Sequence, residues 1–286
     1  MGRRVKSSKS NPGYAQLKPF EESVDYVQSL ARGLRVLRAF DREMPSATLS
    51  QIAERTQLSR AAVRRSLLTL QHLGYLESRG RDFFLTPRVL ELGYSYLTSL
   101  DLTGLAQQSM DQLAQRVSES CSLAVLDGTD IVYVLRVPVR RVMSLTLGVG
   151  TRLPAFAASM GRVLLADWPE TALTKWLHAQ KLRAYTPHTI HTVSALKAEL
   201  VRVRTQGYAL VSRELELGLC SIAVPIRSGD GHAVAALNVA MPYDKDAPAH
   251  AVKHILPALQ EAQGAIELAM RQACWSPHLA MMSAYD

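Results

Sequence analysis

Cysteine is scarce in this sequence, and the three cysteines present are not arranged for pairing or metal binding. Cys121, Cys220 and Cys274 form no C-x-x-C motif and stand at no Cys/His spacing typical of zinc sites. An odd number of cysteines without such a pattern argues against a disulfide framework and a structural zinc site. We therefore expect free thiols, most of them in the hydrophobic core, and no metal ion.

Long apolar runs are absent as well. The longest, such as residues 233–237, fall far short of the roughly 18 consecutive apolar residues that a membrane-spanning helix needs. The first residues, Met1-Gly2-Arg3-Arg4, lead into Lys, Ser, Asn and Pro rather than into the apolar segment of a secretory signal. We expect a cytoplasmic protein with no membrane partner.

The composition is otherwise that of a folded protein. Of the 286 residues, 48 % are hydrophobic and 20 % are charged, so the chain is too apolar to be intrinsically disordered. Since compact domains usually contain roughly 100 to 200 residues, this length predicts about two domains.

The positive charge is concentrated in the first third of the chain. Residues 1–100 contain 16 Lys and Arg against 9 Asp and Glu, whereas residues 101–286 contain 17 against 16. A local basic surplus is typical of a segment that binds phosphate, because each neutralised phosphate releases condensed counterions. Charge alone is equally compatible with a basic surface that has no partner.

The chain begins with a predicted tail and a predicted helix. Residues 1–22 are rich in Ser, Lys, Asn, Gly and Pro without a hydrophobic period, which predicts a mobile basic tail. Apolar residues then recur at intervals of three and four, which predicts a helix that ends at Phe40. Its apolar face consists of Val27, Leu30, Leu34 and Leu37.

The next region has the pattern of a helix-turn-helix. Thr48 and Gln51 have the spacing of a capping box, which predicts the start of a short helix. After a turn at residues 56–59, Ser59 is a favourable N-cap for a second helix. That helix has Val63, Leu67 and Leu70 on its apolar face, and Arg60, Ala61, Arg64 and Arg65 away from that face near its N-terminal end.

A basic hairpin completes this unit. Gly74 ends the second helix, and residues 75–78 and 82–86 have the pattern of two strands around Arg79-Gly80-Arg81. Two helices, a tight turn and a hairpin with a basic tip together predict a winged helix-turn-helix domain over residues 23–86.

Residues 87–101 predict a linker helix. Its apolar residues Val89, Leu92, Tyr96 and Leu100 recur at intervals of three or four. Because a helix between two domains has little core of its own to cover, we expect this stripe to pack against the same stripe of a second chain. The expected assembly is a homodimer, and pairing of two dimers is left open.

Residues 102–271 alternate between strand and helix patterns. This alternation predicts an α+β domain in which helices flank an antiparallel sheet, followed by a C-terminal tail at residues 272–286. The expected strands are residues 122–126, 131–136, 143–147, 208–212, 220–226 and 233–241, with a loop at 148–154. The expected helices are residues 158–168, 169–178 and 194–206, together with one that starts at Leu102 and one that carries Ile255, Leu259, Ala262, Ile266 and Ala269.

Several segments resemble one protein family. Residues 26–40, the winged helix-turn-helix after them, residues 152–166 and residues 207–225 are similar in order and spacing to the IclR family of bacterial transcription regulators. The resemblance covers residues 24–270. The segments SLARGL at the first helix and GTRLPAFAASMGR before the expected helix at residue 158 resemble the branch that controls protocatechuate, 4-hydroxybenzoate and β-ketoadipate catabolism.

This resemblance implies a DNA-binding domain, a linker helix and a GAF-like or profilin-like effector domain whose sheet holds a small organic acid. It implies that Arg65 is the family's recurrent arginine, that Met160, Gly161 and Ser221 line the effector pocket, and that Glu214 orients the pocket loop.

The chain departs from the family pattern at three positions. Gln57 stands where the turn of the helix-turn-helix often has Gly, which predicts a mildly strained backbone or a shifted turn geometry. Ser221 stands where many members have Cys, and Cys220 where many have a larger residue. The last two departures change the chemistry of one pocket wall.

The second helix and the hairpin supply the candidate DNA contacts. Arg60, Arg64 and Arg65 lie in the part of this architecture that enters the major groove, where Arg binds guanine O6 and N7 or phosphate. At the wing tip, contacts with phosphate are expected instead. For an inverted-repeat operator in double-stranded DNA, the predicted contacts are Ser59, Arg60, Ala61, Arg64, Arg65, Arg79 and Arg81.

An aromatic acid requires a cation or amide donors for its carboxylate and an apolar slot for its ring. Arg136, Arg152 and Arg162 are the candidate cations, although a surface ion pair explains each of them equally well. The amides of residues 159–161 begin a helix and are also suited to an anion. The predicted ligand contacts are Arg136, Arg152, Phe156, Ser159, Met160, Gly161, Arg162, Glu214 and Ser221.

The spacing of reactive residues gives no support for catalysis. Nothing places Cys220 beside a histidine, and a cysteine in an apolar strand is usually a core residue. Glu214 and Glu216 lie on an expected extended loop without acid/base geometry, and His188 and His191 lack a third metal ligand. We therefore expect no catalytic residue, no metal ion and no cofactor.

The predicted function is that of a ligand-responsive, DNA-binding regulator of an aromatic-compound catabolic operon. Its expected effector is a small organic acid: 4-hydroxybenzoate, protocatechuate or β-ketoadipate. An enzyme with an α+β catalytic domain and an accessory nucleic-acid-binding domain is the alternative, and it requires a clustered nucleophile and base. An architectural DNA-binding protein would leave residues 102–271 without a role.

Overall fold

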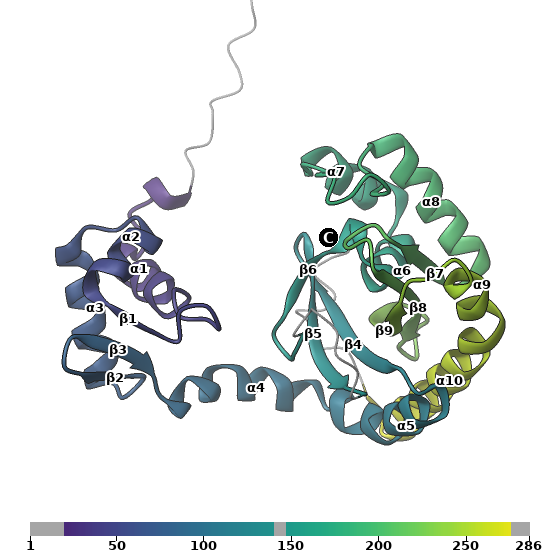
Figure 1. Ribbon diagram of the computed structural model, residues 1–286, viewed down its shortest axis with the longest axis horizontal. Helices are drawn as coiled ribbons and strands as arrows, with labels where there is room; N and C mark the ends of the chain where they lie inside the picture. The colour runs from purple at the N-terminus through teal and green to yellow at the C-terminus, as the bar shows by residue number, and fades with distance from the viewer. Residues whose placement is uncertain (1–19, 140–146, 276–286) are drawn as a thin grey trace, which may run out of the picture. The chain divides into compact units, whose positions relative to one another are not determined.

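Helix α4 (Leu90–Leu100) joins two units of the computed structural model, which describes residues 20–139 and 147–275 (Figure 1). The division between the units falls inside this helix, between Tyr94 and Ser95. A 3-10 turn, Pro87–Val89, precedes α4. No helix in the described part of the chain is long and apolar enough to cross a lipid bilayer.

The N-terminal unit is a winged helix-turn-helix, as the sequence predicts. Its strands form an antiparallel sheet in the order β1-β3-β2. Strand β1, which pairs with β3, is an addition that the sequence pattern did not indicate. The elements are α1 (Gln28–Leu37), β1 (Ser46–Thr48), α2 (Leu49–Thr56), α3 (Arg60–His72), β2 (Leu76–Arg79) and β3 (Asp82–Leu85), preceded by a 3-10 turn at Phe20–Glu22.

Local hydrogen bonds explain why α2 and α3 begin where they do. The capping box is confirmed: Thr48 Oγ1 accepts from the Gln51 backbone N–H at 3.4 Å, and Gln51 Oε1 accepts from the Thr48 N–H at 2.8 Å. Gln57 ends α2 in the left-handed region, with φ 53°, where glycine is the favoured residue. Ser59 then caps α3 by accepting from the Ala62 N–H at 3.3 Å.

Three of the four residues on the apolar face predicted for the first helix are solvent-exposed, and only Leu37 packs against the described core. Val27, Leu30 and Leu34 are 59 %, 62 % and 49 % exposed, whereas Val36, on another face, is fully buried. The periodicity therefore located the helix but not the side that packs on the core, because an apolar stripe has the same spacing whether it meets the core or another surface. The predicted end at Phe40 was also too late, since α1 ends at Leu37.

The C-terminal unit is the predicted α+β domain. Its six-stranded sheet is antiparallel throughout, in the order β6-β5-β4-β9-β8-β7. The strands are β4 (Ser120–Asp127), β5 (Asp130–Val137), β6 (Arg152–Pro154), β7 (Ala209–Ser212), β8 (Leu219–Arg227) and β9 (Ala233–Pro242). The helices are α5 (Leu102–Val117), α6 (Ser159–Asp167), α7 (Glu170–Ala179), α8 (Val193–Gln206), α9 (Ala247–His250) and α10 (Leu256–Gln272), with a π-helical segment at Ala251–Ile255.

The stretch predicted as a loop in this unit contains a strand. The stretch 148–154 is not all loop, because Arg152–Pro154 forms β6 and pairs with β5. Backbone pairing recruits these residues although their sequence shows no strand alternation. The strand expected at residues 143–147 lies outside the described residues, apart from Leu147.

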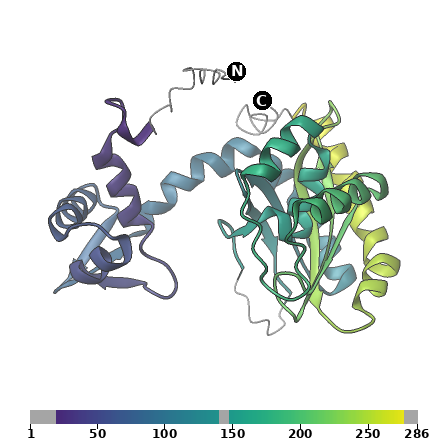
Figure 2. The ribbon, with the colours of Figure 1, turned by 90° about the horizontal axis from the view of Figure 1, so that it is seen from above.

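Helices cover both faces of the sheet, and the two faces differ in side-chain size. Figures 1 and 2 show α10 on one face and the α6–α8 group on the other. Large residues such as Leu237 and Val239 of β9 pack with α5 and α10 in one core. On the opposite face β9 presents Ala236, Asn238 and Ala240, since side chains alternate along a strand. These smaller side chains leave space between the sheet and α6.

Helix α6 approaches the preceding 3-10 turn, Ala155–Ala157, so closely that only glycine fits at residue 161. A Cβ added to Gly161 would overlap the carbonyl oxygen and Cα of Ala155. Because these are backbone atoms of a buried turn, they cannot give way as the end of a flexible side chain would. Gly161 therefore fixes the position of the first turn of α6.

We predict that Gly161→Ala destabilises the protein by about 1–3 kcal/mol, the usual cost of overpacking a core. The matched control is Gly264→Ala in α10, where nothing lies within 4 Å of the added Cβ. There the change should be neutral or stabilising by about 0.5–1 kcal/mol, because alanine is the better helix former. Urea unfolding of the full chain measures both, and equal stability of Gly161→Ala and wild type would contradict the close approach.

Candidate functional site

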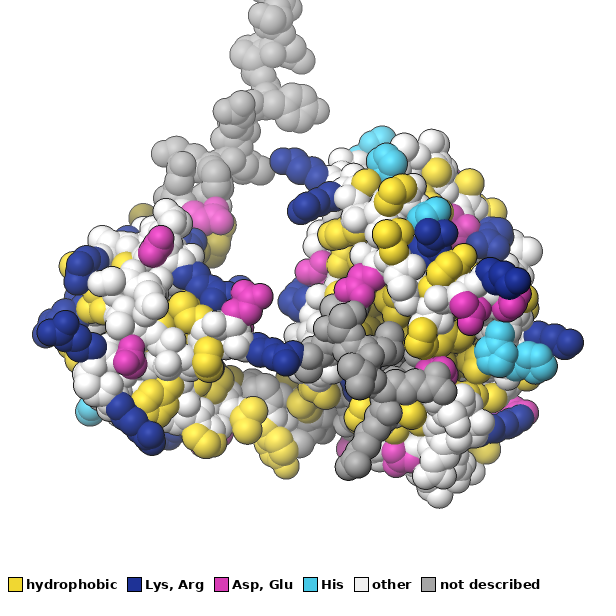
Figure 3. Space-filling view, viewed as in Figure 1, with side chains coloured by type: hydrophobic (Ala, Val, Ile, Leu, Met, Phe, Trp, Pro, Cys, Tyr) yellow, Lys and Arg dark blue, Asp and Glu magenta, His cyan; other side chains and the backbone are white. Residues whose placement is uncertain are grey.

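The N-terminal unit exposes the basic face of α3. All five predicted contacts on this helix and its cap are solvent-exposed, while Val63 and Leu67 of the same helix are fully buried. Figure 3 shows Lys and Arg side chains on the visible face of this unit. The exposed set is Ser59, Arg60, Ala61, Arg64 and Arg65.

The wing carries two further exposed arginines. Arg79 ends β2 and Arg81 lies in the turn after Gly80, which has φ 62°. The guanidinium of Arg79 lies 5.0 Å from the centre of the Phe84 ring, so one wing residue is held by its neighbour on β3. Helix α3 and the wing thus present positive charge from two elements of one small unit.

The C-terminal unit contains a cavity of about 210 Å³ between the sheet and α6. This volume is below the roughly 300–1,000 Å³ typical of sites for drug-sized ligands, so it suits a short or single-ring molecule. Its apolar lining includes Leu147, Leu153, Met160, Tyr185, Val211 and Leu219.

Two cross-strand rows of the sheet contribute to the floor of this cavity, the first through Arg136 and Asn238 and the second through all four of its residues. In the first row Arg136 pairs with Ser122, Ser122 with Asn238, and Asn238 with Ala223. Directly paired residues point to the same face, so the row brings a guanidinium, a hydroxyl and an amide together. Arg136 Nη1 donates to Ser122 Oγ at 3.2 Å, the one hydrogen bond of this guanidinium within the described residues. The second row is Ser120, Ala240, Ser221 and Val211.

The first turn of α6 forms the opposite wall. Its N-cap is Ala158, so no side chain caps the free backbone N–H groups of Ser159, Met160 and Gly161. The Ser159 and Ser221 hydroxyl oxygens lie 2.7 Å apart, and Asn238 Nδ2 donates to Ser221 Oγ at 3.0 Å. The cavity thus has donors at both walls.

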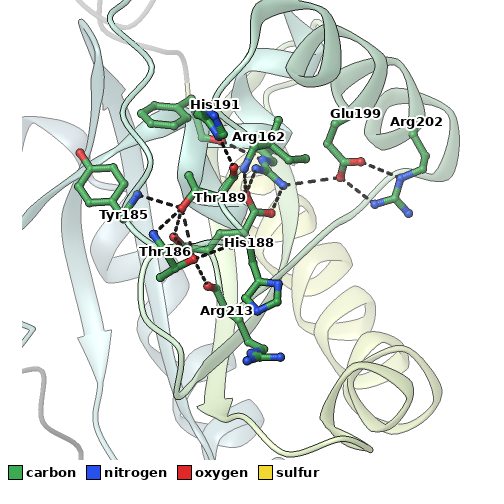
Figure 4. Close-up of polar contacts among 12 residues, drawn as sticks. Arg162, Tyr185, Thr186, His188, Thr189, His191, Glu199, Arg202 and Arg213 are labelled. Carbon is green, nitrogen blue, oxygen red and sulfur yellow. Dashed lines mark hydrogen bonds and ion pairs between the residues drawn. The ribbon is translucent and has the colours of Figure 1, made fainter.

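A buried ion pair holds the rim of the cavity. Arg162 is 1 % exposed, and its Nη1 and Nη2 donate to Glu214 Oε1 and Oε2 at 2.7 and 2.6 Å. Arg162 Nε donates to the Phe156 carbonyl at 2.9 Å, and the Ile190 N–H donates to Glu214 Oε2 at 2.8 Å. Figure 4 shows Arg162 facing this cluster, with Glu199 on its other side.

Threonine hydroxyls tie the segment at residues 185–190 to the same rim (Figure 4). Thr186 Oγ1 donates to the Arg213 carbonyl and Thr189 Oγ1 to the Glu214 carbonyl, both at 2.6 Å. These hydrogen bonds also position Tyr185 of the same segment. Tyr185 lines the cavity, and its ring centre lies 6.1 Å from that of Phe156. Burial of another lining phenol, Tyr133, raises its pKa to about 12, so it stays neutral.

The predicted ligand contacts fall into two groups. Arg136, Ser159, Met160, Glu214 and Ser221 line the cavity. The other four lie outside its lining, each with a structural role of its own. Phe156 and Gly161 are core residues of the α6 start, Arg162 is buried in the ion pair with Glu214, and Arg152 bonds Asp127 at 2.6 Å and Asp130 at 3.2 Å on the surface.

Sequence reasoning missed Asn238, Tyr185 and Val211. Asn238 carried a signal, since a lone amide in the apolar run of residues 233–241 is costly to bury without a purpose. Tyr185 had no such signal, because it lies in a segment without periodicity.

The cysteines are not placed for nucleophilic chemistry. Cys121 and Cys220 are buried and Cys274 is exposed. Burial raises the pKa of the Cys121 thiol to about 12 and also raises that of Cys220, so neither forms a thiolate readily. Among the described residues no three His, Cys, Asp or Glu side chains are grouped as metal ligands.

The fold and the two sites define a class of protein: a unit with a basic helix-turn-helix joined to a unit with a cavity of small-molecule size. Two family models match the chain. The IclR helix-turn-helix domain matches residues 29–80, and the model described as bacterial transcriptional regulator IclR C-terminal matches residues 94–268. The chain belongs to the IclR family of bacterial transcription regulators, and this membership excludes the enzyme alternative.

Characterised relatives cover most of the chain. It is 42 % identical over 248 residues to the Pca regulon regulatory protein of Pseudomonas putida, an alignment that spans 86 % of this chain and 85 % of that protein. It is 38 % identical to the p-hydroxybenzoate hydroxylase transcriptional activator of Acinetobacter baylyi, over 82 % of this chain and 89 % of the relative.

A solved structure is similar over both units. It is an IclR homologue from Microbacterium hydrocarbonoxydans in complex with 4-hydroxybenzoate, 32 % identical, with a TM-score of 0.75. The match covers 85 % of this chain and 99 % of that one. The protein is therefore an IclR-type DNA-binding regulator related to aromatic-pathway regulators.

We predict that Arg162→Met destabilises the fold by about 3–5 kcal/mol, because it leaves the Glu214 carboxylate buried without its partner. Arg152→Met makes the same chemical change at an arginine whose side chain is 40 % exposed, and should cost at most about 1 kcal/mol. Chemical denaturation of both variants compares them directly. If both variants lost a similarly small amount of unfolding free energy, the buried ion pair would contribute no more stability than the surface ion pair.

Proposed function

We propose that this regulator controls an aromatic-compound catabolic operon and that a small organic acid binds in the cavity beside α6. The observation that carries the proposal is a cavity of single-ring size with donors for a carboxylate at its walls. The relatives named for p-hydroxybenzoate and Pca regulation and the homologue in complex with 4-hydroxybenzoate support the class of effector.

The charges of the cavity favour one place for the carboxylate. Arg162 cancels the charge of Glu214, which leaves Arg136 and Glu216 as the other charged lining residues. An anion is therefore attracted toward Arg136 and the free amides of α6, whose N-terminus carries positive partial charge. The apolar side chains of the lining then contact the ring.

We expect micromolar to millimolar binding of 4-hydroxybenzoate, protocatechuate or β-ketoadipate in calorimetry. Arg136→Met should weaken binding about 100-fold, because it removes a charge-assisted donor from a half-buried site. Arg152→Met is the matched control and should bind like wild type. A bulky residue at Ser221 should also weaken binding.

The outcomes separate two parts of this proposal. If none of the three acids gives heat or thermal stabilisation, the assignment to aromatic-compound catabolism is wrong. If an acid binds and Arg136→Met binds it equally well, the α6 amides hold the carboxylate and only the role of Arg136 is lost.

For the DNA site, we propose that α3 enters the major groove and that the wing contacts phosphate on an inverted-repeat operator. The support is the exposure of the α3 arginines and of the wing tip. A homodimer would present two such units to the two half-sites, since protein symmetry and operator symmetry match in this type of complex.

Arg65→Ala should weaken operator binding by about 1–3 kcal/mol and relax its sequence preference if Arg65 contacts a base. Arg79→Ala should weaken operator and unrelated DNA alike and lower the salt dependence, as expected of a phosphate contact. Lys197→Ala, on α8 of the other unit, removes one charge as a control. Wild-type affinity of both arginine variants in gel shifts at moderate salt would refute this placement.

The dimer proposal is supported by an apolar groove on the N-terminal unit. It runs along α1 and α3 and reaches α4 at Leu92, which is 54 % exposed. Leu30 and Leu34 line it and are similarly exposed. An exposed apolar surface of this kind is typical of a protein interface, and we assign it to the second copy of the chain.

Leu92→Glu should give monomers that stay folded but lose specific DNA binding, because a charge in an apolar interface is not compensated. Val201→Glu alters an exposed residue of α8, 58 % exposed, and should keep the wild-type mass. Analytical ultracentrifugation decides, with circular dichroism to confirm folding. An unchanged dimer mass for Leu92→Glu would remove α4 from the interface.

A further inference from the structure

The buried side-chain oxygen of Asn238 has no hydrogen-bond partner among the residues that the structure describes. The residue lies in the middle of β9 and is 3 % exposed. Its Nδ2 donates to Ser221 Oγ, but its Oδ1 accepts no hydrogen bond within the described residues. Because buried polar atoms in native proteins are almost always paired, an unpaired acceptor at this position needs an explanation.

The strand register places this amide at the floor of the cavity. Asn238 lies between Ser122 on β4 and Ala223 on β8, in the row that Arg136 begins. Both Asn238 and Arg136 line the cavity. Ala223, the neighbour on the other side, has no side-chain group that can donate a hydrogen bond.

The hydrogen bonds of the neighbouring hydroxyls do not supply the missing donor. Asn238 Nδ2 donates to Ser221 Oγ, so the Ser221 proton is available to Ser159 Oγ, 2.7 Å away. The Ser159 proton is then free to point into the cavity at the start of α6. Arg136 donates to Ser122 Oγ. Among the described side chains that line the cavity there are several donors, and Asn238 Oδ1 is the one buried acceptor that has no hydrogen bond.

These two sets of groups match different parts of a ligand. A carboxylate has no proton at neutral pH, so it satisfies the donors of Arg136, Ser159 and the α6 amides and cannot pair with Asn238 Oδ1. A ring C–H is a poor donor, whereas a hydroxyl donates well. A ligand therefore satisfies both the donors and the acceptor of the cavity only if it has a carboxylate and also a hydrogen-bond donor on its ring.

We propose that Asn238 is a specificity-determining residue, whose Oδ1 accepts a hydrogen bond from a ring hydroxyl and so selects hydroxylated aromatic acids over unsubstituted ones. The proposal rests on the proposed function, since it assumes an aromatic acid in the cavity. It adds the part of the ligand that the carboxylate donors do not recognise.

Calorimetry with matched acids tests this on the full-length protein. The probes are 4-hydroxybenzoate and 4-fluorobenzoate, with 3-hydroxybenzoate and 3-fluorobenzoate as a second pair, because fluorine replaces the hydroxyl without a proton to donate. In wild type at least one hydroxybenzoate should bind about 10- to 100-fold more tightly than its fluoro partner, which leaves the buried acceptor unpaired.

Asn238→Leu should bring that ratio close to one. The hydroxybenzoate should lose affinity, and the fluorobenzoate should bind at least as tightly as it does to wild type. The control is Val211→Ala, which shortens an apolar lining residue and should weaken both members of a pair by the same factor. Thermal unfolding confirms that each variant is folded, and the wild-type ratios test the proposal even if Asn238→Leu does not fold.

The results distinguish this proposal from the one on which it rests. If no acid binds, both fail. If the acids bind to wild type with equal affinity, or if the fluoro acid binds more tightly in both pairs, Asn238 does not select a hydroxyl although the cavity binds acids. If Asn238→Leu weakens the binding of the hydroxybenzoate and of the fluorobenzoate by the same factor, the proposal is also overturned. A residue with a purely structural role would weaken both equally.

Discussion

The ion pair between Arg162 and Glu214 is the interaction on which the cavity depends. It joins α6 to the loop between β7 and β8, and further bonds to the Phe156 carbonyl and the Ile190 N–H bring in two more segments. Burial of two charges is costly, and it is offset here because both carboxylate oxygens and all three guanidinium nitrogens form hydrogen bonds. The rim of the cavity is thereby fixed before any ligand arrives.

Much of this architecture follows from the sequence, because its signals are local. The capping box at Thr48, the N-cap at Ser59 and the basic turn around Gly80 each depend on a few neighbouring residues, and all are found in the structure. The antiparallel sheet was also predictable from alternating segments and short turns. The strand β6 was not, since its pairing with β5 is a contact between distant residues rather than a local pattern.

The site was less predictable than the fold for the same reason. The sequence identified Arg136 and Arg162 as equivalent candidates. In the structure Arg136 lines the cavity, whereas Arg162 forms a buried ion pair with Glu214. Which arginine meets a carboxylate depends on the strand register and on the loop that returns to α6. Similarly, the apolar residues Val27, Leu30 and Leu34 have the spacing of a core face but are exposed, a difference that only tertiary packing decides.

The two units give the molecule a cavity that suits an acid and a basic surface that suits DNA, and regulation requires that occupancy of one changes the affinity of the other. Such coupling is reciprocal: the factor by which a ligand changes the affinity for DNA equals the factor by which DNA changes the affinity for the ligand. A ligand that binds the DNA-bound and the DNA-free protein with equal affinity does not change the affinity for DNA, however tightly it binds.

The most direct test is therefore to measure 4-hydroxybenzoate affinity for the free protein and for the protein saturated with its operator, identified by footprinting of the DNA next to its own gene. The account predicts that the two affinities differ, by a factor in the range of about 5- to 150-fold typical of allosteric proteins, and that the acid changes operator affinity by the same factor. Identical affinity for the acid with and without the operator would contradict it.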